Sequence, residues 1–301
     1  RLPENASSMP GAMLIGATAN KMYAKETGRI TGEELKALGI NMNLAPVLDV
    51  NSNPDNPVIG VRSYSSNPYT VRDFGISMMK GLLESDVMAT VKHFPGHGDT
   101  AVDSHLGLPV VEKDLEELME CELIPFVSAI QEGAPCIMTS HILFPKLEQE
   151  KKPATMSKAI LTDLLRDKLD FKGIIVTDCL EMSAILSYYG TACGAVEAVK
   201  AGAQLLCISH TADLVIETIL KIEAAVKTGE IPMKLIDKAV DNIIRFKEEY
   251  KIDYLKDKTT SIDDHQHKDI IMEMVLSGIT KVSDYELPDV SEDTIIIGSY
   301  A

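Results

Sequence analysis

The 301-residue chain carries a formal net charge of -16 at pH 7, with 45% hydrophobic and 25% charged residues. This composition is that of an ordinary globular protein, and the length suffices for one large domain or two smaller ones. The acidic balance argues against binding to nucleic acid or to anionic membranes, because both need clustered lysines and arginines. No apolar run approaches the roughly 20 residues of a membrane-spanning helix.

The five cysteines are widely spaced and form no CxxC pair, which argues against a zinc ribbon or a redox motif. Their apolar surroundings predict reduced, buried thiols, and this slightly favours a cytoplasmic location. Secretion or attachment to the cell wall stays open, because the chain begins with Arg1 and its targeting cannot be read.

The predicted elements alternate along the chain. A helix comes first, over about residues 11–38, and amphipathic helices are expected over 113–133 and 233–248, where apolar residues recur every three or four positions. Five apolar runs are predicted to be strands, at residues 40–50, 88–94, 135–141, 173–178 and 203–209. Strands of this kind are covered on both faces, so the alternation indicates a parallel α/β fold.

Two parallel α/β folds compete for this pattern. A doubly wound sheet with a dinucleotide site would carry a glycine-rich turn after a strand, and no GxGxxG or P-loop is present. A (β/α)8 TIM-type barrel places its chemistry where strands end. Polar residues gather at those ends, namely Asp49, Lys92, His93, Ser140, His141 and Asp178. The barrel is therefore the predicted fold.

Only five strands can be counted, so we expect the barrel to lack its first strand or strands upstream of Arg1. The predicted barrel domain covers residues 1–255. Residues 256–301 are expected to hold a linker helix and the beginning of a second, C-terminal α/β domain.

The segment KHFPGHGDTAVDSHLGLP, residues 92–109, gathers side chains that could bind a metal, transfer protons or form turns. Its candidates are His93, His97, Asp99, Asp103 and His105. Their spacing fits no compact metal signature, so no metal and no cofactor is predicted. His97 and Asp99 are expected to satisfy turn hydrogen bonds. Asp103 lies two residues before His105, and its carboxylate can orient that imidazole for proton transfer.

Asp178 follows the apolar run GIIVT and is held at the predicted catalytic rim. Asp is also a good helix N-cap, so a capping role competes with a catalytic one. A carboxylate nucleophile and a separate proton donor are what a retaining glycosidase requires. A histidine with a pKa of about 6.5 can be that donor near neutral pH. Asp49 and His141 are expected to support the rim.

Three segments now become recognisable together. NLAPVLDVNSNPDNPVIGVRSYSSNP, KHFPGHGDTAVDSHLGLP and FKGIIVTDCLEM resemble glycoside hydrolase family 3, in its β-N-acetylglucosaminidase branch. The resemblance extends over about residues 1–250. It implies a (β/α)8 barrel that is often followed by an α/β sandwich domain.

The resemblance also implies roles for the catalytic residues. Asp178 in VTDCLEM corresponds to the nucleophile that forms a glycosyl-enzyme intermediate. His105 in DSH corresponds to the acid/base, and Asp103 to its partner.

The sugar-binding residues follow from the same resemblance. Lys92, His93 and Arg62 correspond to residues that hold the sugar. Arg1 matches the final arginine of a DQEGGRVQR-type segment.

The predicted function is that of a retaining exo-β-N-acetylglucosaminidase acting on a carbohydrate partner, either peptidoglycan fragments or chitooligosaccharides. Phosphorolysis beside hydrolysis stays open, because an imidazole repels phosphate less than a carboxylate does. Three rivals remain: a metal-dependent hydrolase on the same barrel, a sugar-binding or scaffold protein, and a family 3 β-glucosidase.

Overall fold

The computed structural model describes residues 6–100, 108–250 and 267–280. Three predicted site residues, Arg1, Asp103 and His105, lie outside the described residues. The last predicted strand, within residues 292–301, also lies outside them.

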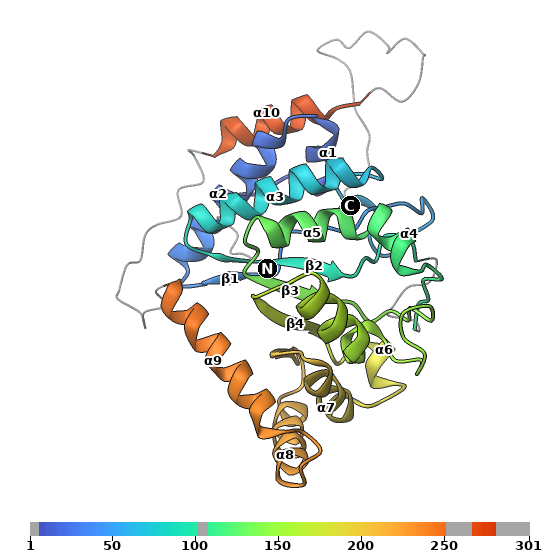
Figure 1. Ribbon diagram of the computed structural model, residues 1–301. Helices are drawn as coiled ribbons and strands as arrows, with labels where there is room; N and C mark the ends of the chain where they lie inside the picture. Colours follow the sequence, from blue (N-terminus) through green and yellow to red (C-terminus); the bar gives the residue numbers. More distant parts are fainter. Residues whose placement is uncertain (1–5, 101–107, 251–266, 281–301) are drawn as a thin grey trace, which may run out of the picture.

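A parallel five-stranded sheet forms a half-barrel at the centre of the molecule (Figure 1). Its strands pair in chain order and are β1 (Met42–Asn43), β2 (Met88–Phe94), β3 (Cys136–Thr139), β4 (Ile174–Cys179) and β5 (Leu205–Cys207). Each lies within or overlaps a run that the sequence predicts. In parallel strands the carboxyl ends meet at one edge, and this edge collects the polar residues discussed below.

The first strand is shorter than the predicted run over 40–50. Within that run, only Met42–Asn43 forms a regular strand, but the backbone after it still hydrogen-bonds to β2. Lys92 donates its N–H to the carbonyl of Pro46 at 3.1 Å and accepts from the N–H of Leu48 at 2.6 Å. Pro46 has no N–H to donate, so the regular ladder is interrupted there.

Both faces of the sheet are largely buried along β2, β3 and β4, as their apolar sequences predict, whereas β1 and β5 are half-buried. Along β4, Ile175 faces the core under the helices, whereas Ile174 and Val176 face the inner core of the half-barrel. The outer core is covered by α2 (Lys21–Ala37), α3 (Pro68–Glu84), α4 (Leu115–Glu120), α5 (Leu123–Gln131), η3 (Ala159–Lys168, a π-helix) and α7 (Thr191–Ala201). The shorter or peripheral elements are α1 (Ala12–Ala17), η1 (Gly60–Arg62), η2 (Ala154–Met156), α6 (Ser183–Leu186), α8 (Ala212–Lys227), α9 (Met233–Glu249) and α10 (Lys268–Gly278).

The helix predicted over 11–38 is two helices, α1 and α2. The side chain of Asn20 accepts a hydrogen bond from the N–H of Met22 at 3.1 Å and so caps the start of α2. Asn competes well with helical backbone for such hydrogen bonds, and it therefore begins a new helix here.

The helix predicted over 113–133 is also divided, into α4 and α5. Pro125 lies in the first turn of α5. In one continuous helix its ring would clash with the carbonyl of Cys121, so the chain breaks before it. Glu122 lies in the break and is only 1% exposed.

Helix α9 contacts the edge of the sheet where β4 begins. The side chain of Asn242 donates to the carbonyl of Gly173 at 3.1 Å. Phe246 is buried and joins the inner core of the half-barrel. The amphipathic face that the sequence predicts is only partly buried, however, because Val240 and Ile244 are exposed.

Helix α10 lies against α1, beside the first elements of the chain (Figure 1). Tyr23 of α2 donates its hydroxyl to Glu273 of α10 at 2.6 Å. Within the described ranges, no helix has the length and apolar character to cross a membrane.

The five thiols are all free. Cys136 is buried, but Cys193 is exposed on the outer side of α7, so the prediction of buried thiols is wrong there. The apolar neighbours of Cys193 in the sequence face the other side of the same helix, where Ala192 and Ala195 are buried.

Candidate active site

Four predicted polar residues meet at the carboxyl edge of the sheet. Asp178 is the penultimate residue of β4, and Lys92 and His93 are near the end of β2. Arg62, at the end of η1, extends toward the same place, since its Nη2 lies 3.5 Å from Nε2 of His93. Residues far apart in the sequence thus form one polar cluster.

His93 is held by a buried carboxylate. Its Nδ1 lies 2.7 Å from Oδ2 of Asp49, and its backbone N–H donates to Oδ1 at 3.1 Å. An ionised carboxylate only accepts hydrogen bonds, so Nδ1 carries a proton and Nε2 faces the cluster. Burial alone would raise the pKa of Asp49, but the His93 ring and the hydrogen bonds from His93 hold that pKa below its usual value. Asp49 therefore supports the rim as an anion.

Asp178 is also held as an anion, although part of it reaches solvent. Its Oδ1 accepts the N–H of Cys179 at 2.7 Å, and its Oδ2 lies 3.9 Å from Nε2 of His93. Burial raises the pKa of Asp178, but His93, His141, the Cys179 N–H and Lys92 more than offset this, so the pKa is lowered. The side chain is 25% exposed, which leaves an ionised oxygen accessible to a ligand.

The pKa of Lys92 is lowered as well, which for a basic group disfavours the charged form. Burial and the nearby Arg62 guanidinium lower the pKa of its ammonium, while Asp178 and Asp49 act to raise it. The cluster therefore combines one accessible carboxylate with two basic side chains, Lys92 and Arg62, and the Nε2 nitrogen of His93. Such a set can hold the hydroxyls of a polar ligand beside a nucleophilic oxygen.

His141 fixes the backbone next to Asp178. Its Nε2 lies 3.0 Å from the carbonyl oxygen of Cys179, which can only accept, and its Nδ1 lies 2.8 Å from Oγ1 of Thr155. Burial lowers the pKa of His141. The Cys179 carbonyl requires a proton on Nε2, so His141 donates there and anchors the backbone that follows the carboxylate.

Cys207 is a neighbour of the cluster that reasoning from the sequence missed. It ends β5, and burial, with further contributions from Asp178 and Cys179, raises the pKa of its thiol to about 11. The thiol is therefore neutral beside the anionic Asp178. Its position at a strand end, shared with Asp178, was the signal that could have identified it.

Of the two residues predicted to make turn hydrogen bonds, His97 does so, with its Nδ1 3.0 Å from Oγ1 of Thr100, whereas Asp99 contacts a residue outside the turn. Oδ1 of Asp49 accepts the N–H of His97 at 2.7 Å, and burial lowers the pKa of His97 to about 4. Asp99 forms an ion pair with Lys113, with Nζ and Oδ2 3.0 Å apart.

A metal centre was the rival interpretation of this segment. In residues 6–100, 108–250 and 267–280, no three His, Cys, Asp or Glu side chains form a group suited to a metal ion. His93 uses one ring nitrogen for Asp49 instead.

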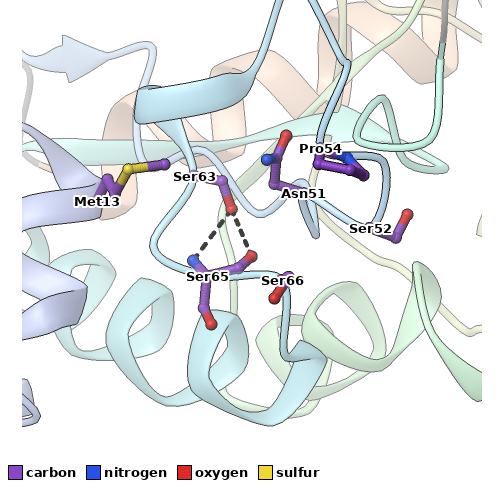
Figure 2. A pocket seen from close by; sticks show the side chains of 7 residues that line it. All are labelled: Met13, Asn51, Ser52, Pro54, Ser63, Ser65 and Ser66. Atoms are coloured by element: carbon purple, nitrogen blue, oxygen red, sulfur yellow. Dashed lines mark hydrogen bonds between the residues drawn. The ribbon is translucent and has the colours of Figure 1, made fainter. Parts of the chain in front are cut away.

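A pocket of about 390 Å³ does not include any residue of the cluster (Figure 2). It is lined by Met13, Asn51, Ser52, Pro54, Ser63, Ser65 and Ser66. Ser63 follows Arg62 in the chain, and its hydroxyl lies 2.7 Å from the carbonyl oxygen of Asp49 and 2.9 Å from that of Ser65. The pocket wall and the segment that carries Arg62 are thus tied to the backbone that follows β1, at Asp49.

The comparisons with known proteins now give the family. Residues 1–246 match the model of the glycosyl hydrolase family 3 N terminal domain. The chain is 36% identical over 301 residues to beta-hexosaminidase A of Pseudoalteromonas piscicida, covering 93% of this chain and 50% of that protein. A beta-hexosaminidase of Neisseria meningitidis is 36% identical over 202 residues, covering 67% of this chain and 55% of that protein.

A solved structure of a glycoside hydrolase family 3 β-N-acetylglucosaminidase from Paenibacillus sp. is similar throughout. It superposes with a TM-score of 0.94 at 41% identity, over 97% of this chain and 56% of that one. The chain therefore has the parallel α/β fold of a glycoside hydrolase N-terminal domain. It belongs to glycoside hydrolase family 3, and it spans about half the length of the relatives named above.

Proposed function

We propose that the protein is a retaining exo-β-N-acetylglucosaminidase that removes terminal β-linked N-acetylglucosamine through a covalent glycosyl-enzyme intermediate. The observation that carries the proposal is Asp178, an ionised and partly exposed carboxylate at the carboxyl edge of the sheet, flanked by Lys92 and His93. A carboxylate in this state can attack an anomeric carbon.

In the first step, an oxygen of Asp178 attacks the anomeric carbon as the bond to the leaving oxygen breaks. His105, protonated and oriented by Asp103, gives its proton to that oxygen. In the second step His105 takes a proton from water, and the water oxygen displaces Asp178 from the anomeric carbon. Two displacements at one carbon give net retention.

The sugar would be held by the groups around Asp178. Lys92, Arg62 and Arg1 carry donors for hydroxyl oxygens, and His93 presents Nε2 because Asp49 occupies Nδ1. Peptidoglycan fragments and chitooligosaccharides both present a terminal β-N-acetylglucosamine, and both are proposed substrates.

We also propose the larger architecture in which this site lies. Residues 1–255 would belong to a complete (β/α)8 barrel, to which strands in addition to β1–β5 contribute. Residues 256–301 would form the linker helix and the start of an α/β sandwich domain.

The nucleophile is tested by Asp178→Asn in the full-length protein, assayed with an aryl β-N-acetylglucosaminide. We expect kcat/KM to fall at least about 1,000-fold, because the amide cannot form the glycosyl ester. Asp163→Asn is the matched control, since Asp163 is an exposed carboxylate paired with Lys158. Unchanged hydrolysis by Asp178→Asn would refute the assignment.

Three further measurements separate the proposal from its rivals. Proton NMR of early product should show the β-anomer first, whereas an inverting enzyme gives the α-anomer. Activity that disappears with a chelator and returns with a metal would favour the metal-dependent hydrolase. A preference for aryl β-glucosides would favour the β-glucosidase.

A further inference from the structure

Thr155, in η2, has a fully buried side chain whose hydroxyl contacts three groups at the end of β3. Its Oγ1 lies 2.7 Å from Oγ1 of Thr139, 2.8 Å from Nδ1 of His141 and 2.9 Å from the carbonyl oxygen of Ser140. Thr139 is the last residue of β3, and the other two follow it at the carboxyl edge of the sheet. The Thr155 hydroxyl is therefore the centre of a buried hydrogen-bond network at the edge that carries Asp178.

The backbone of η2 holds Thr155 in this position. Ala154 donates its N–H to the carbonyl of Ile142 at 2.8 Å, and Thr155 donates its own N–H to the carbonyl of Ser140 at 3.2 Å. The segment before and at Thr155 is thus hydrogen-bonded to the chain that follows β3. Its hydroxyl is placed by the main chain and does not depend on a free rotation of the side chain.

The protons of this network can be assigned from the groups that only accept. Nε2 of His141 carries a proton, because it lies 3.0 Å from the carbonyl oxygen of Cys179. Burial lowers the pKa of His141 and so favours the neutral ring, whose Nδ1 accepts the hydroxyl proton of Thr155. The Ser140 carbonyl, the second acceptor within reach, receives the N–H of Thr155 instead. The hydroxyl of Thr139 then donates to Oγ1 of Thr155.

Three hydrogen bonds therefore point the same way, from Thr139 through Thr155 and His141 to Cys179. Hydrogen bonds in such a series polarise and strengthen one another. Cys179 is the residue that holds Asp178, since its N–H donates to Oδ1 of that carboxylate at 2.7 Å. Both backbone groups of Cys179 are thus engaged, one by the carboxylate and one by His141.

We propose that Thr155 is a positioning residue for the nucleophile Asp178, acting through His141 and Cys179. This inference rests on the proposed function, in which Asp178 attacks the anomeric carbon. A misplacement of about 1 Å that arises away from the chemistry can cost about 100-fold in rate. Lys92 and Arg62, which would hold the sugar, belong to β2 and η1. The loss should therefore affect the chemical step and leave binding of the sugar in place.

The test is Thr155→Val in the full-length protein, because Val has nearly the same shape and lacks the hydroxyl. We expect kcat/KM for an aryl β-N-acetylglucosaminide to fall about 10- to 100-fold. The Ki of N-acetylglucosamine as a competitive inhibitor should change less than about twofold, since ground-state binding is retained. Thr155→Ser keeps the hydroxyl and should retain most of the activity.

Thr218→Val is the matched control. Thr218, on α8, is 2% exposed, and its hydroxyl has no hydrogen-bond partner among the described residues. Removing this hydroxyl should change neither kcat/KM nor the Ki. Equal losses of kcat/KM and of affinity for N-acetylglucosamine in Thr155→Val would show a general disturbance of the site and overturn the inference.

A double-mutant cycle shows whether Thr155 acts through His141. His141→Gln removes the ring nitrogen to which the Thr155 hydroxyl donates, so adding Thr155→Val should cost less than about a further twofold. Additive losses would show that Thr155 acts by another route, contrary to the inference.

Thr139→Val answers the same question if Thr155→Val fails to fold. It removes the hydroxyl that donates to Thr155, and we expect kcat/KM to fall about 2- to 10-fold with the Ki unchanged. An unchanged kcat/KM in this variant would count against the network and overturn the inference.

Asp178→Asn separates this inference from the proposed function. If Asp178→Asn loses hydrolysis but Thr155→Val keeps its kcat/KM, the inference alone is wrong. If Asp178→Asn hydrolyses normally, the nucleophile assignment is wrong and the inference falls with it.

Discussion

His93 lies between two carboxylates that differ in exposure. Asp49 is fully buried and bonded to Nδ1, whereas Asp178 is partly exposed and 3.9 Å from Nε2. One carboxylate thus orients the ring, and the other stays accessible on the side that the ring faces. At the scale of single residues, the site depends on these two different roles of Asp49 and Asp178.

The role of Asp49 in orienting the His93 ring predicts the effect of Asp49→Asn. The Asn amide oxygen can still accept the backbone N–H groups of His93 and His97, as Oδ1 of Asp49 does, but its NH₂ group then faces Nδ1 of His93 and favours the tautomer with the proton on Nε2. We expect kcat/KM to fall between about 10- and 1,000-fold, as for other losses of a group that sets a histidine tautomer. Steady-state kinetics with the aryl glycoside measure it.

The control for Asp49→Asn is again Asp163→Asn, whose carboxylate is exposed. Thermal unfolding of both variants separates a local effect from loss of the fold. A folded Asp49→Asn protein with unchanged kcat/KM would contradict the role given to Asp49.

At the scale of elements, breaks in helices shape the site as much as the strands do. The break before Pro125 leaves Glu122 buried where it can bind Lys113. The amphipathic pattern over 113–133 did not reveal this break, because periodicity averages over a window while a single proline ends a helix. Pro125 itself was the local signal.

Helix α9 gives a prediction at this scale. Phe246→Ala should lower the free energy of unfolding by about 3 to 5 kcal/mol, because it removes a buried ring from the inner core. Ile244→Ala, on the exposed side of the same helix, should cost less than about 1 kcal/mol. Chemical denaturation measures both. Equal costs would show that Phe246 does not stabilise the half-barrel.

At the scale of the whole molecule, acid should destabilise the fold. The pKa of the buried His97 is about 4 in the folded protein, against about 6.5 when unfolded. A lowered folded pKa means that the unfolded state binds the proton first, so stability is complete above about pH 6.5 and decreases as the pH falls toward 4. Asp49, whose pKa is lowered, adds a further loss below its usual pKa of about 4.

We therefore expect His97→Asn to flatten the pH dependence of stability. The titration of His97 accounts for about 3 kcal/mol between pH 6.5 and 4. Urea unfolding at pH 6.5, 5.5 and 4.5 measures the slope for both proteins. Identical slopes would show that His97 titrates alike in both states. His210→Asn, at an exposed histidine, is the control.

The parts of the fold that the sequence predicts are those set by local pattern. Apolar runs located the five strands of the described sheet, because burial on both faces makes most strand positions apolar. The extent of β1 and the division of two helices were missed, since each depends on one residue that removes or competes for a backbone hydrogen bond. Pro46, Asn20 and Pro125 are those residues.

The sequence by itself determined where the strands lie along the chain, the position of Asp178 at a strand end and the family. Tertiary structure alone decided which of the polar residues meet. Asp49 and His93 are 44 positions apart, yet their side chains are 2.7 Å apart, and no periodicity along the chain encodes that contact. The same holds for Phe246 in the inner core. Local propensity acts over a few residues, whereas these contacts exist only after the strands and helices have packed.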